Sequence, residues 1–339
     1  MKAKKIANII AVTVLFAAAV ITAFAMHLKI QSMEHENAAK RFSNGTRFSQ
    51  ITLFLPESAE FTVGKARYFE YELDKKLTEK SVTPENDGAR LYVSAYSLYK
   101  DRTLTPAESF NSKRSADVKM LLVGGDYALF HPELADAPRV TGDVNHDRIL
   151  LSRTAAWRLF GGSELYDFEV VADEKSYFVS GVFADFEADE YSDFLGDRAL
   201  CISDMAREPD ANISVYEILL VNPVTDFAKG LVTECIGLDE NTYYLVENSS
   251  RFSVGKLFKK IPKLLDTDTQ LPNGVTITPE EISALKTEKE LCAMLILVLI
   301  FSAYPVLWLC ILLYRLIKLL KGLLDKFVFD KIRDKLSYS

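Results

Sequence analysis

Two long apolar segments constrain this chain more than any other feature of its sequence. Residues 6–26 form a run of 21 residues without a charge, and residues 291–314 form a second run of 24. Each run is long enough to cross the hydrocarbon layer of a bilayer, roughly 30 Å thick, as an α-helix. We therefore expect a multi-pass protein of the cell membrane, with the lipid bilayer as one of its partners.

The residues that flank these segments predict the orientation of the chain. Lys2, Lys4 and Lys5 precede the first segment, and Arg315, Lys318 and Lys321 follow the second. Lys and Arg accumulate on the cytoplasmic side of membrane segments, so both termini are predicted to be cytoplasmic and the large central part extracytoplasmic. An alternative for the first segment is a cleaved signal peptide, because Ala23-Phe24-Ala25 matches an A-x-A cleavage site. The central part is exported in either case.

The central part of the chain is acidic. Residues 30–290 hold 29 Lys and Arg against 44 Asp and Glu. Nucleic acids and anionic lipids are bound by basic surfaces, so we expect no nucleic-acid partner for this region.

The pattern of apolar residues in the central part predicts an α+β fold with split βαβ-like units and a hairpin. Short strand-like runs alternate with short amphipathic helices, which favours a mixed fold over a sandwich. We predict strands at 51–55, 89–99, 118–123, 149–151, 168–171, 177–183, 199–203, 215–221 and 242–246, with helices at 62–79, 153–160, 226–236 and 253–265. Residues 97–111 and 185–197 are predicted to be irregular.

Residues 123–183 carry the most specific local pattern. Ser152 is placed to cap a short helix that ends at Gly161-Gly162, and Ala172-Asp173-Glu174-Lys175 is typical of a hairpin turn. The order of these pieces resembles the extracytoplasmic core domain of MacB/FtsX-type ABC transporter permeases. The matching residues are Val123, Gly125, Asp126 and Tyr127, then Leu151, Ser152, Ala155, Leu159, Phe160 and Gly161, and finally Tyr177, Val179, Gly181 and Val182. Pro138-Arg139-Val140 and Leu165-Tyr166-Asp167 depart from the family pattern.

The resemblance implies a permease-like component of an ABC transporter-type system. In that family a separate cytoplasmic ATPase subunit or domain drives movement of the extracytoplasmic domain, so the implied partners are an ATPase subunit, other permease-like chains and an extracytoplasmic protein or peptide. The family has four membrane crossings, whereas this sequence has two. The alternative is a membrane-anchored sensor, adaptor or assembly module that does not transport.

Thr278-Pro279-Glu280-Glu281 predicts the start of a helix. Thr at the cap, Pro at the first position and Glu at the third form a capping box. The predicted helix covers residues 279–320 as a stalk followed by a full crossing, and Pro305 is expected to kink it. After Gly322 the pattern favours an amphipathic helix on the cytoplasmic leaflet or a soluble tail.

These observations predict seven regions. They are a cytoplasmic N-terminus (1–5), transmembrane helix 1 (6–26), a stalk or linker (27–48), the extracytoplasmic core domain (49–277), a stalk helix (278–290), transmembrane helix 2 (291–314) and a cytoplasmic amphipathic tail (315–339).

No catalytic, cofactor-binding or metal-binding residues are predicted. GxSxG, HExxH and GxxxxGK[ST] motifs are absent from the sequence, so we expect neither an enzyme nor a cofactor. Asp143 to Asp147 matches the start of a calcium loop, but Arg148 and Thr154 occupy the two most discriminating positions, so a plain turn is favoured. His27, His35, His131 and His146 are expected to be surface or core residues. Cys201 and Cys235 are left open as a disulfide or as two thiols.

Overall fold

The computed structural model describes residues 2–33, 38–42, 47–84, 86, 88–107, 114–134, 140–141, 146–186, 188–262 and 271–336. The chain divides into two units. The sheet domain comprises Ser32–Lys256 and Asp266–Thr287, and the helical unit comprises Met1–Gln31, Leu257–Leu265 and Glu288–Ser339. The division falls within the predicted stalk helix.

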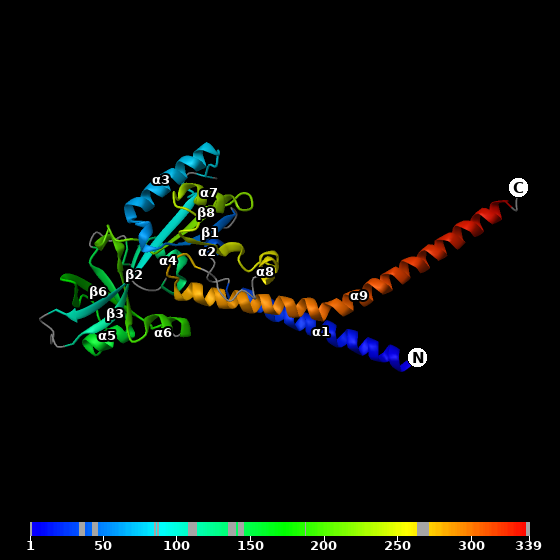
Figure 1. Ribbon diagram of the computed structural model, residues 1–339, viewed down its shortest axis with the longest axis horizontal. Helices are drawn as coiled ribbons and strands as arrows, with labels where there is room; N and C mark the ends of the chain where they lie inside the picture. Colours follow the sequence, from blue (N-terminus) through cyan, green and yellow to red (C-terminus); the bar gives the residue numbers. More distant parts are fainter. Residues whose placement is uncertain are drawn as a thin grey trace. The chain divides into compact units, whose positions relative to one another are not determined.

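Strands and short helices alternate along the sheet domain (Figure 1). The strands are β1 (Phe48–Phe54), β2 (Tyr92–Pro106), β3 (Ala116–Gly125), β4 (Arg148–Ser152), β5 (Glu169–Ala172), β6 (Lys175–Phe183), β7 (Ala199–Asp204), β8 (Val215–Val221) and β9 (Tyr244–Glu247). The helices of the chain are α1 (Lys2–Ser32), α2 (Ala38–Phe42), α3 (Val63–Glu79), α4 (Tyr127–Phe130), α5 (Arg153–Phe160), α6 (Asp189–Leu195), α7 (Phe227–Cys235), α8 (Val254–Lys260) and α9 (Pro279–Leu336). Single 3-10 turns are η2 (Glu57–Ala59), η3 (Pro132–Leu134), η4 (Met205–Arg207) and η5 (Asn248–Ser250).

The strands form one mixed sheet in the order β3-β7-β4-β6-β5-β2-β8-β1-β9. An additional pairing of β2 with β3 closes six of these strands into a ring. The long strand β2 makes this possible, because its first residues pair with β8 while Thr105 and Pro106 pair with β5. The β3–β7 and β4–β6 pairs are parallel and the others are antiparallel. The predicted mixed α/β fold class is therefore confirmed.

Both faces of the sheet are buried, and neighbouring residues of a strand contribute to different cores. In β3, Val118, Met120 and Leu122 belong to the larger core, whereas Leu121 and Val123 belong to a second core. This is the expected result of side chains that alternate between the two faces of a strand. Residues of α3, α5 and α7 complete the larger core, and residues of α2, α4 and η3 complete the second.

Local signals in the sequence placed several element ends correctly. The Thr62 side chain accepts a hydrogen bond from the Lys65 backbone N–H, and Ser152 does the same for Ala155. Helix α5 ends at Gly161, which has a left-handed φ of 73°. Asp173 and Glu174 both have positive φ, which is the geometry that a two-residue hairpin turn requires.

Other predictions are corrected by the structure. The irregular region expected at 97–111 is strand as far as Pro106, because β2 bridges two parts of the sheet. The loop expected at 185–197 contains α6, whose Phe194 packs edge-on against Tyr99. Helix α8 ends at Lys260, within the helix predicted for 253–265. All four cysteines are free thiols, so Cys201 and Cys235 are not joined.

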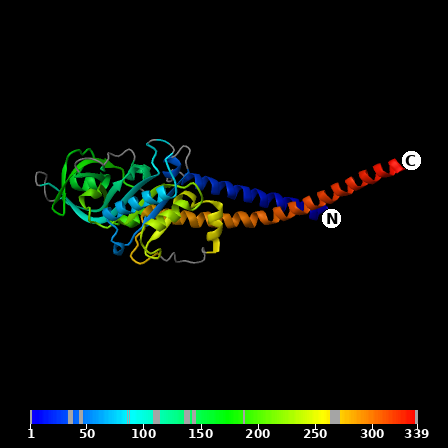
Figure 2. The same ribbon diagram turned by 90° about the horizontal axis from the view of Figure 1, so that it is seen from above.

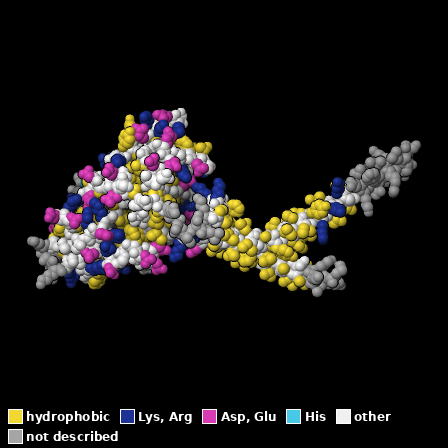
Figure 3. Space-filling model, viewed as in Figure 1, with side chains coloured by type: hydrophobic (Ala, Val, Ile, Leu, Met, Phe, Trp, Pro, Cys, Tyr) yellow, Lys and Arg dark blue, Asp and Glu magenta, His cyan; other side chains and the backbone are white. Residues whose placement is uncertain are grey.

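The helical unit contains α1 and most of α9. Two helical segments, Ile6–Ser32 and Pro279–Leu324, are long and apolar enough to cross a membrane. Most of their large apolar side chains are exposed, whereas the core helix of a soluble protein would bury them. Figure 3 shows the contrast between the hydrophobic surface of these helices and the charged surface of the sheet domain. This exposure is what a bilayer segment requires.

Helix α9 is longer than predicted. It runs from Pro279 to Leu336, over 58 residues, with Pro305 inside it, so the residues after Gly322 continue the same helix. Figure 1 shows that α9 bends in its orange part, which includes Pro305. In Figures 1 and 2, α1 runs beside the neighbouring part of α9, and Lys29 forms an ion pair with Glu290. Lys260 of α8 pairs with Glu288 at 2.7 Å.

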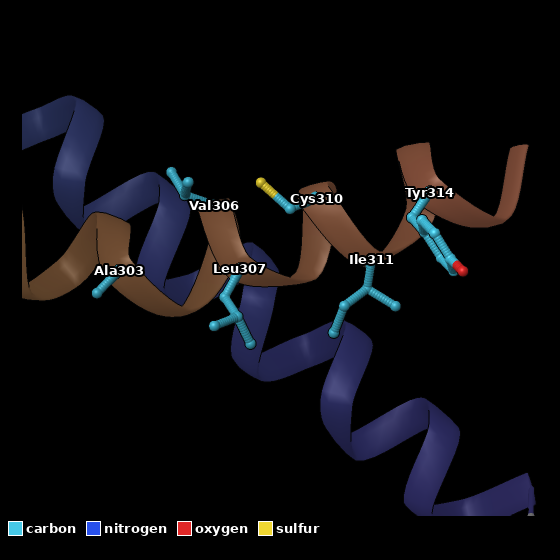
Figure 4. Close-up of a pocket in the computed structure, with 6 residues that line it drawn as sticks. All are labelled: Ala303, Val306, Leu307, Cys310, Ile311 and Tyr314. Atoms are coloured by element: carbon cyan, nitrogen blue, oxygen red, sulfur yellow. The ribbon is translucent and has the colours of Figure 1, made fainter. Parts of the chain in front are cut away.

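A shallow apolar groove of about 560 Å³ lies on α9 within the helical unit. Figure 4 shows Val306 and Cys310 on one side of the helix and Leu307 and Ile311 on the opposite side. The groove belongs to a segment whose apolar surface is expected to contact lipid or another helix.

Candidate functional site at the start of α9

The first turn of α9 is the place where the sheet domain holds the long helix. Thr278 caps the turn, since its hydroxyl accepts a hydrogen bond from the Glu281 backbone N–H at 3.4 Å. The predicted helix start is therefore confirmed. The capping box is only half formed, because the Glu281 side chain pairs with Arg251 instead of returning to the cap. Glu280 and Glu281 project from this turn into two different surroundings.

Glu281 makes a buried, bidentate ion pair. Arg251, which follows η5, donates from its two terminal nitrogens to the two Glu281 oxygens at 2.6 and 2.8 Å. The two side chains are only 3% and 5% exposed. The hydroxyl of Tyr244 in β9 donates a further bond to Glu281 at 3.3 Å. Parallel N–H···O bonds of this kind fix orientation as well as distance, so this pair anchors α9 to the β9 side of the domain.

Glu280 makes a different set of contacts. Its Oε1 accepts a short hydrogen bond from the hydroxyl of Tyr191 in α6. Its Oε2 is buried and has no hydrogen-bond partner among the described residues. A second link between the same two helices joins Lys286 to Glu190 at 3.3 Å. Helix α6, which the sequence did not predict, is thus the second anchor of α9.

The end of β3 directs a histidine toward Glu280. Gly125 has a φ of 70°, and a Cβ at this position would lie 2.4 Å from the Ser94 carbonyl oxygen, so only glycine fits. The chain then turns at Asp126, whose N–H bonds the same carbonyl at 2.9 Å. The turn places Tyr127 in the second core, where its ring stacks on that of His131 at 4.0 Å. The Gly-Asp-Tyr residues of the family-like motif therefore position His131.

His131 bridges two carboxylates. Its Nε2 lies 2.7 Å from Oε2 of Glu217, and its Nδ1 lies 3.2 Å from Oε1 of Glu133. Glu217 is the only charged residue of the buried strand β8. Arg41 of α2 donates to the carbonyl of Leu129 at 2.7 Å and adds positive charge near Glu133. A histidine, three carboxylates and several tyrosines thus gather around the start of α9.

The surroundings shift the pKa values of this cluster. Burial lowers the pKa of His131, but Glu217 and Glu133 outweigh it and hold that pKa well above its ordinary value. Burial raises the pKa of Glu133, but His131 outweighs it and the net pKa is lowered. Burial raises the pKa values of Tyr99, Tyr127 and Tyr191, and the nearby carboxylates raise them further. The tyrosines are neutral hydroxyl donors, whereas His131 is held as a cation when nothing else neutralises the carboxylates.

Three side chains of the cluster have the chemistry of metal ligands. The ligand-type atoms of His131, Glu133 and Glu280 all lie within 4.8 Å of one another. Sequence reasoning missed this group, because Glu280 is far from the other two in the chain. One signal was available: a lone glutamate in the apolar strand VYEILLV is expected to have a buried partner.

The other residues weighed in the sequence lie elsewhere. His146 lies 2.8 Å from Asp204 at the end of β7, and His27 lies in α1. Residues 142–145 of the rejected calcium loop and residue 35 fall outside the described residues. The prediction that the protein has no catalytic residues stays a prediction.

Comparisons with known proteins give structural likenesses only. No protein-family model and no curated protein matches the chain. The chain is similar to the periplasmic region of MacB from Actinobacillus actinomycetemcomitans, with 10% identity and a TM-score of 0.38 over 65% of this chain and 94% of that one. It is similar to the extracellular domain of the noncanonic ABC-type transporter YknZ from Gram-positive bacteria, with 16% identity and a TM-score of 0.36 over 58% and 99%.

A further likeness is to Cmr4 (Cas7) from Pyrococcus furiosus, with 12% identity and a TM-score of 0.23 over 59% of this chain and 100% of that one.

Proposed function

We propose that the protein is a membrane-anchored, permease-like component of an ABC transporter-type system. Its sheet domain lies outside the cytoplasm, binds a protein or peptide partner, and moves together with α9. Support comes from the two exposed apolar helices, from the basic flanks of these helices, and from the resemblance of residues 123–183 to the transporter domains. A separate cytoplasmic ATPase supplies the energy.

The attachment of α9 is the observation that carries this proposal. The first turn is held by the Arg251–Glu281 ion pair and by the bond from Tyr191 to Glu280. From that turn the chain continues as one helix to Leu336. A continuous helix transmits a displacement of one end to the other, whereas a flexible linker absorbs it. Movement of the sheet domain is therefore conveyed along α9 toward the cytoplasmic side.

The orientation is tested by labelling intact cells with a membrane-impermeant maleimide. A cysteine replacing the exposed Glu240 should react from outside, and a cysteine replacing Ser339 should react only after lysis. The unaltered chain, which has four cysteines of its own, gives the background. Labelling in the reverse pattern would overturn the proposed topology.

The coupling is tested by softening α9 beyond its anchored turn. Replacing Leu285, Lys286 and Thr287 by three glycines costs the helix about 1 kcal/mol per residue relative to alanine. Replacing the same residues by three alanines removes the same side chains and keeps the helix, so it is the matched control. Both proteins are isolated from membranes together with their partners, and the ATPase activity of each preparation is measured.

We expect an ATPase to copurify with both variants. A cysteine replacing the exposed Ile282 reports the movement through its rate of reaction with a maleimide. Addition of ATP with vanadate should change this rate in the alanine variant and leave it unchanged in the glycine variant. Copurification of an envelope partner without any ATPase would favour the sensor or adaptor alternative. Equal responses in the two variants would show that α9 is only a tether.

A further inference from the structure

We propose that His131, Glu133 and Glu280 bind one divalent transition-metal ion, with Zn²⁺ the best match to the ligands. Their ligand-type atoms lie within 4.8 Å of one another, in the part of the chain that the structure describes. Zn²⁺ accepts imidazole nitrogen and carboxylate oxygen, and three protein ligands leave a position for water or for a group from a partner. The sequence did not predict this site, because His131 and Glu280 lie in distant elements.

The contacts of His131 suit it for this role. Its Nε2 is 2.7 Å from the buried Glu217, so Nε2–H donates to that carboxylate. When a metal ion displaces the other ring proton, the lone pair is on Nδ1, which faces Glu133 at 3.2 Å. Metal-binding histidines usually donate their other N–H to a carboxylate, which fixes the tautomer and the ring. Stacking on Tyr127 holds the ring in the same orientation.

A second observation favours a cation bound at this site. The Glu280 Oε2 is buried without a hydrogen-bond partner among the residues the structure describes. A buried carboxylate oxygen in this condition is costly unless a cation or a donor meets it. The cluster contains three carboxylates: His131 bridges those of Glu133 and Glu217, Arg41 adds positive charge near Glu133, and the third belongs to Glu280. A divalent ion would balance the charge and give Oε2 a partner.

The ion would join η3 to the first turn of α9. Glu133 belongs to η3 and Glu280 to α9, so binding would add a third link to the two that hold this turn. The site itself does not depend on the proposed function. The effect of the ion on the movement of α9 rests on the proposed function. The experiment below therefore measures metal binding alone.

The test uses the full-length chain in detergent, stripped with EDTA and dialysed. Zn²⁺ is titrated by calorimetry, and the melting temperature is measured with and without the ion. We expect saturable binding of one Zn²⁺ per chain and a higher melting temperature, because the ion binds the folded state. His131→Gln, Glu133→Gln and Glu280→Gln should each weaken binding at least about tenfold. Glu280→Gln retains an acceptor for Tyr191, so the fold is kept.

Matched controls are His146→Gln, a histidine outside the cluster, and the exposed Glu240→Gln, both of which should bind Zn²⁺ as the unaltered chain does. Melting curves of every variant in EDTA confirm that each is folded. Failure of the unaltered chain to bind Zn²⁺, or binding by the three cluster variants as tight as by the unaltered chain, would overturn the proposal. Preference for Ca²⁺ or Mg²⁺ over Zn²⁺ would also overturn it, because those ions favour all-oxygen ligands.

Discussion

Two consecutive glutamates at the start of α9 differ sharply in the hydrogen-bond and ion-pair partners of their carboxylates. Glu281 receives both terminal nitrogens of Arg251 and the hydroxyl of Tyr244. Glu280 receives the hydroxyl of Tyr191 on one oxygen and nothing among the described residues on the other. Both lie in the first turn of the same helix, where the helix dipole favours a negative charge. The dipole is therefore common to both and cannot explain the difference.

The difference separates a structural contact from a candidate ligand. A buried ion pair with satisfied geometry holds its two elements together and needs nothing further. An oxygen that is buried without a partner costs free energy in the folded protein unless a bound group meets it. We infer that Glu281 anchors α9 permanently and that Glu280 is available to an ion. The predictions below test this contrast, beginning with the largest expected effect.

Removing Glu281 should cause the largest loss of stability. Glu281→Leu removes the carboxylate that accepts from both terminal nitrogens of Arg251, and breaking a buried ion pair in this way costs about 3–5 kcal/mol. The measurement is thermal unfolding of the full-length chain in detergent, with EDTA present.

The double variant Arg251→Met, Glu281→Leu is the control. It removes both charges and fills the space with apolar side chains, so it should recover most of the lost stability. If the double variant is no more stable than Glu281→Leu, Arg251 and Glu281 do not act as a pair, and the comparison between the two glutamates fails.

Removing the hydroxyl of Tyr191 should have an intermediate effect. Tyr191→Phe keeps the ring and deletes the hydrogen bond to Glu280, and a hydrogen bond to a charged group contributes about 1.5–3 kcal/mol. The matched variant Tyr244→Phe should cost less, because Glu281 keeps both bonds from Arg251. Thermal unfolding in EDTA measures both. An equal loss of stability in the two variants would mean that the carboxylates of Glu280 and Glu281 depend equally on their tyrosine hydroxyls, and the contrast between them would fail.

Local signals predicted most elements of the fold, because they depend on neighbouring residues. Thr62, Ser152 and Gly161 mark helix ends through bonds and dihedral angles within a few residues. The prediction failed where contacts between residues distant in the sequence determine the secondary structure. Strand β2 continues through Thr105 and Pro106 because β5 pairs with it there. Helix α6 forms in an acidic stretch, where its Phe194 packs against Tyr99 and its Tyr191 bonds Glu280, both distant in the sequence.

The candidate site was beyond sequence reasoning for the same reason. Each member comes from a different element: His131 follows α4, Glu217 lies in β8 and Glu280 in α9. The capping box predicted where α9 begins and also assigned Glu281 a role that it does not have. The sequence could show that Glu281 is at the third position of a helix. It could not show that Arg251 is a stronger partner than the backbone N–H of the cap.

Neutralising Glu280 should have the smallest effect on stability, and of the opposite sign. In EDTA, Glu280→Gln should raise the free energy of unfolding by no more than about 1 kcal/mol, because it removes the charge from a side chain whose Oε2 is buried without a hydrogen-bond partner among the described residues, and it keeps an acceptor for Tyr191. Glu281→Gln is the matched control and should lower stability, since it takes the negative charge away from Arg251. With Zn²⁺ present the order should change, because the unaltered chain gains stability from the ion and Glu280→Gln does not. A loss of stability for Glu280→Gln in EDTA that exceeds the loss for Tyr191→Phe would show that Oε2 already has a favourable partner. In that case the buried oxygen would no longer indicate a cation, and the contrast between Glu280 and Glu281 would be one of degree.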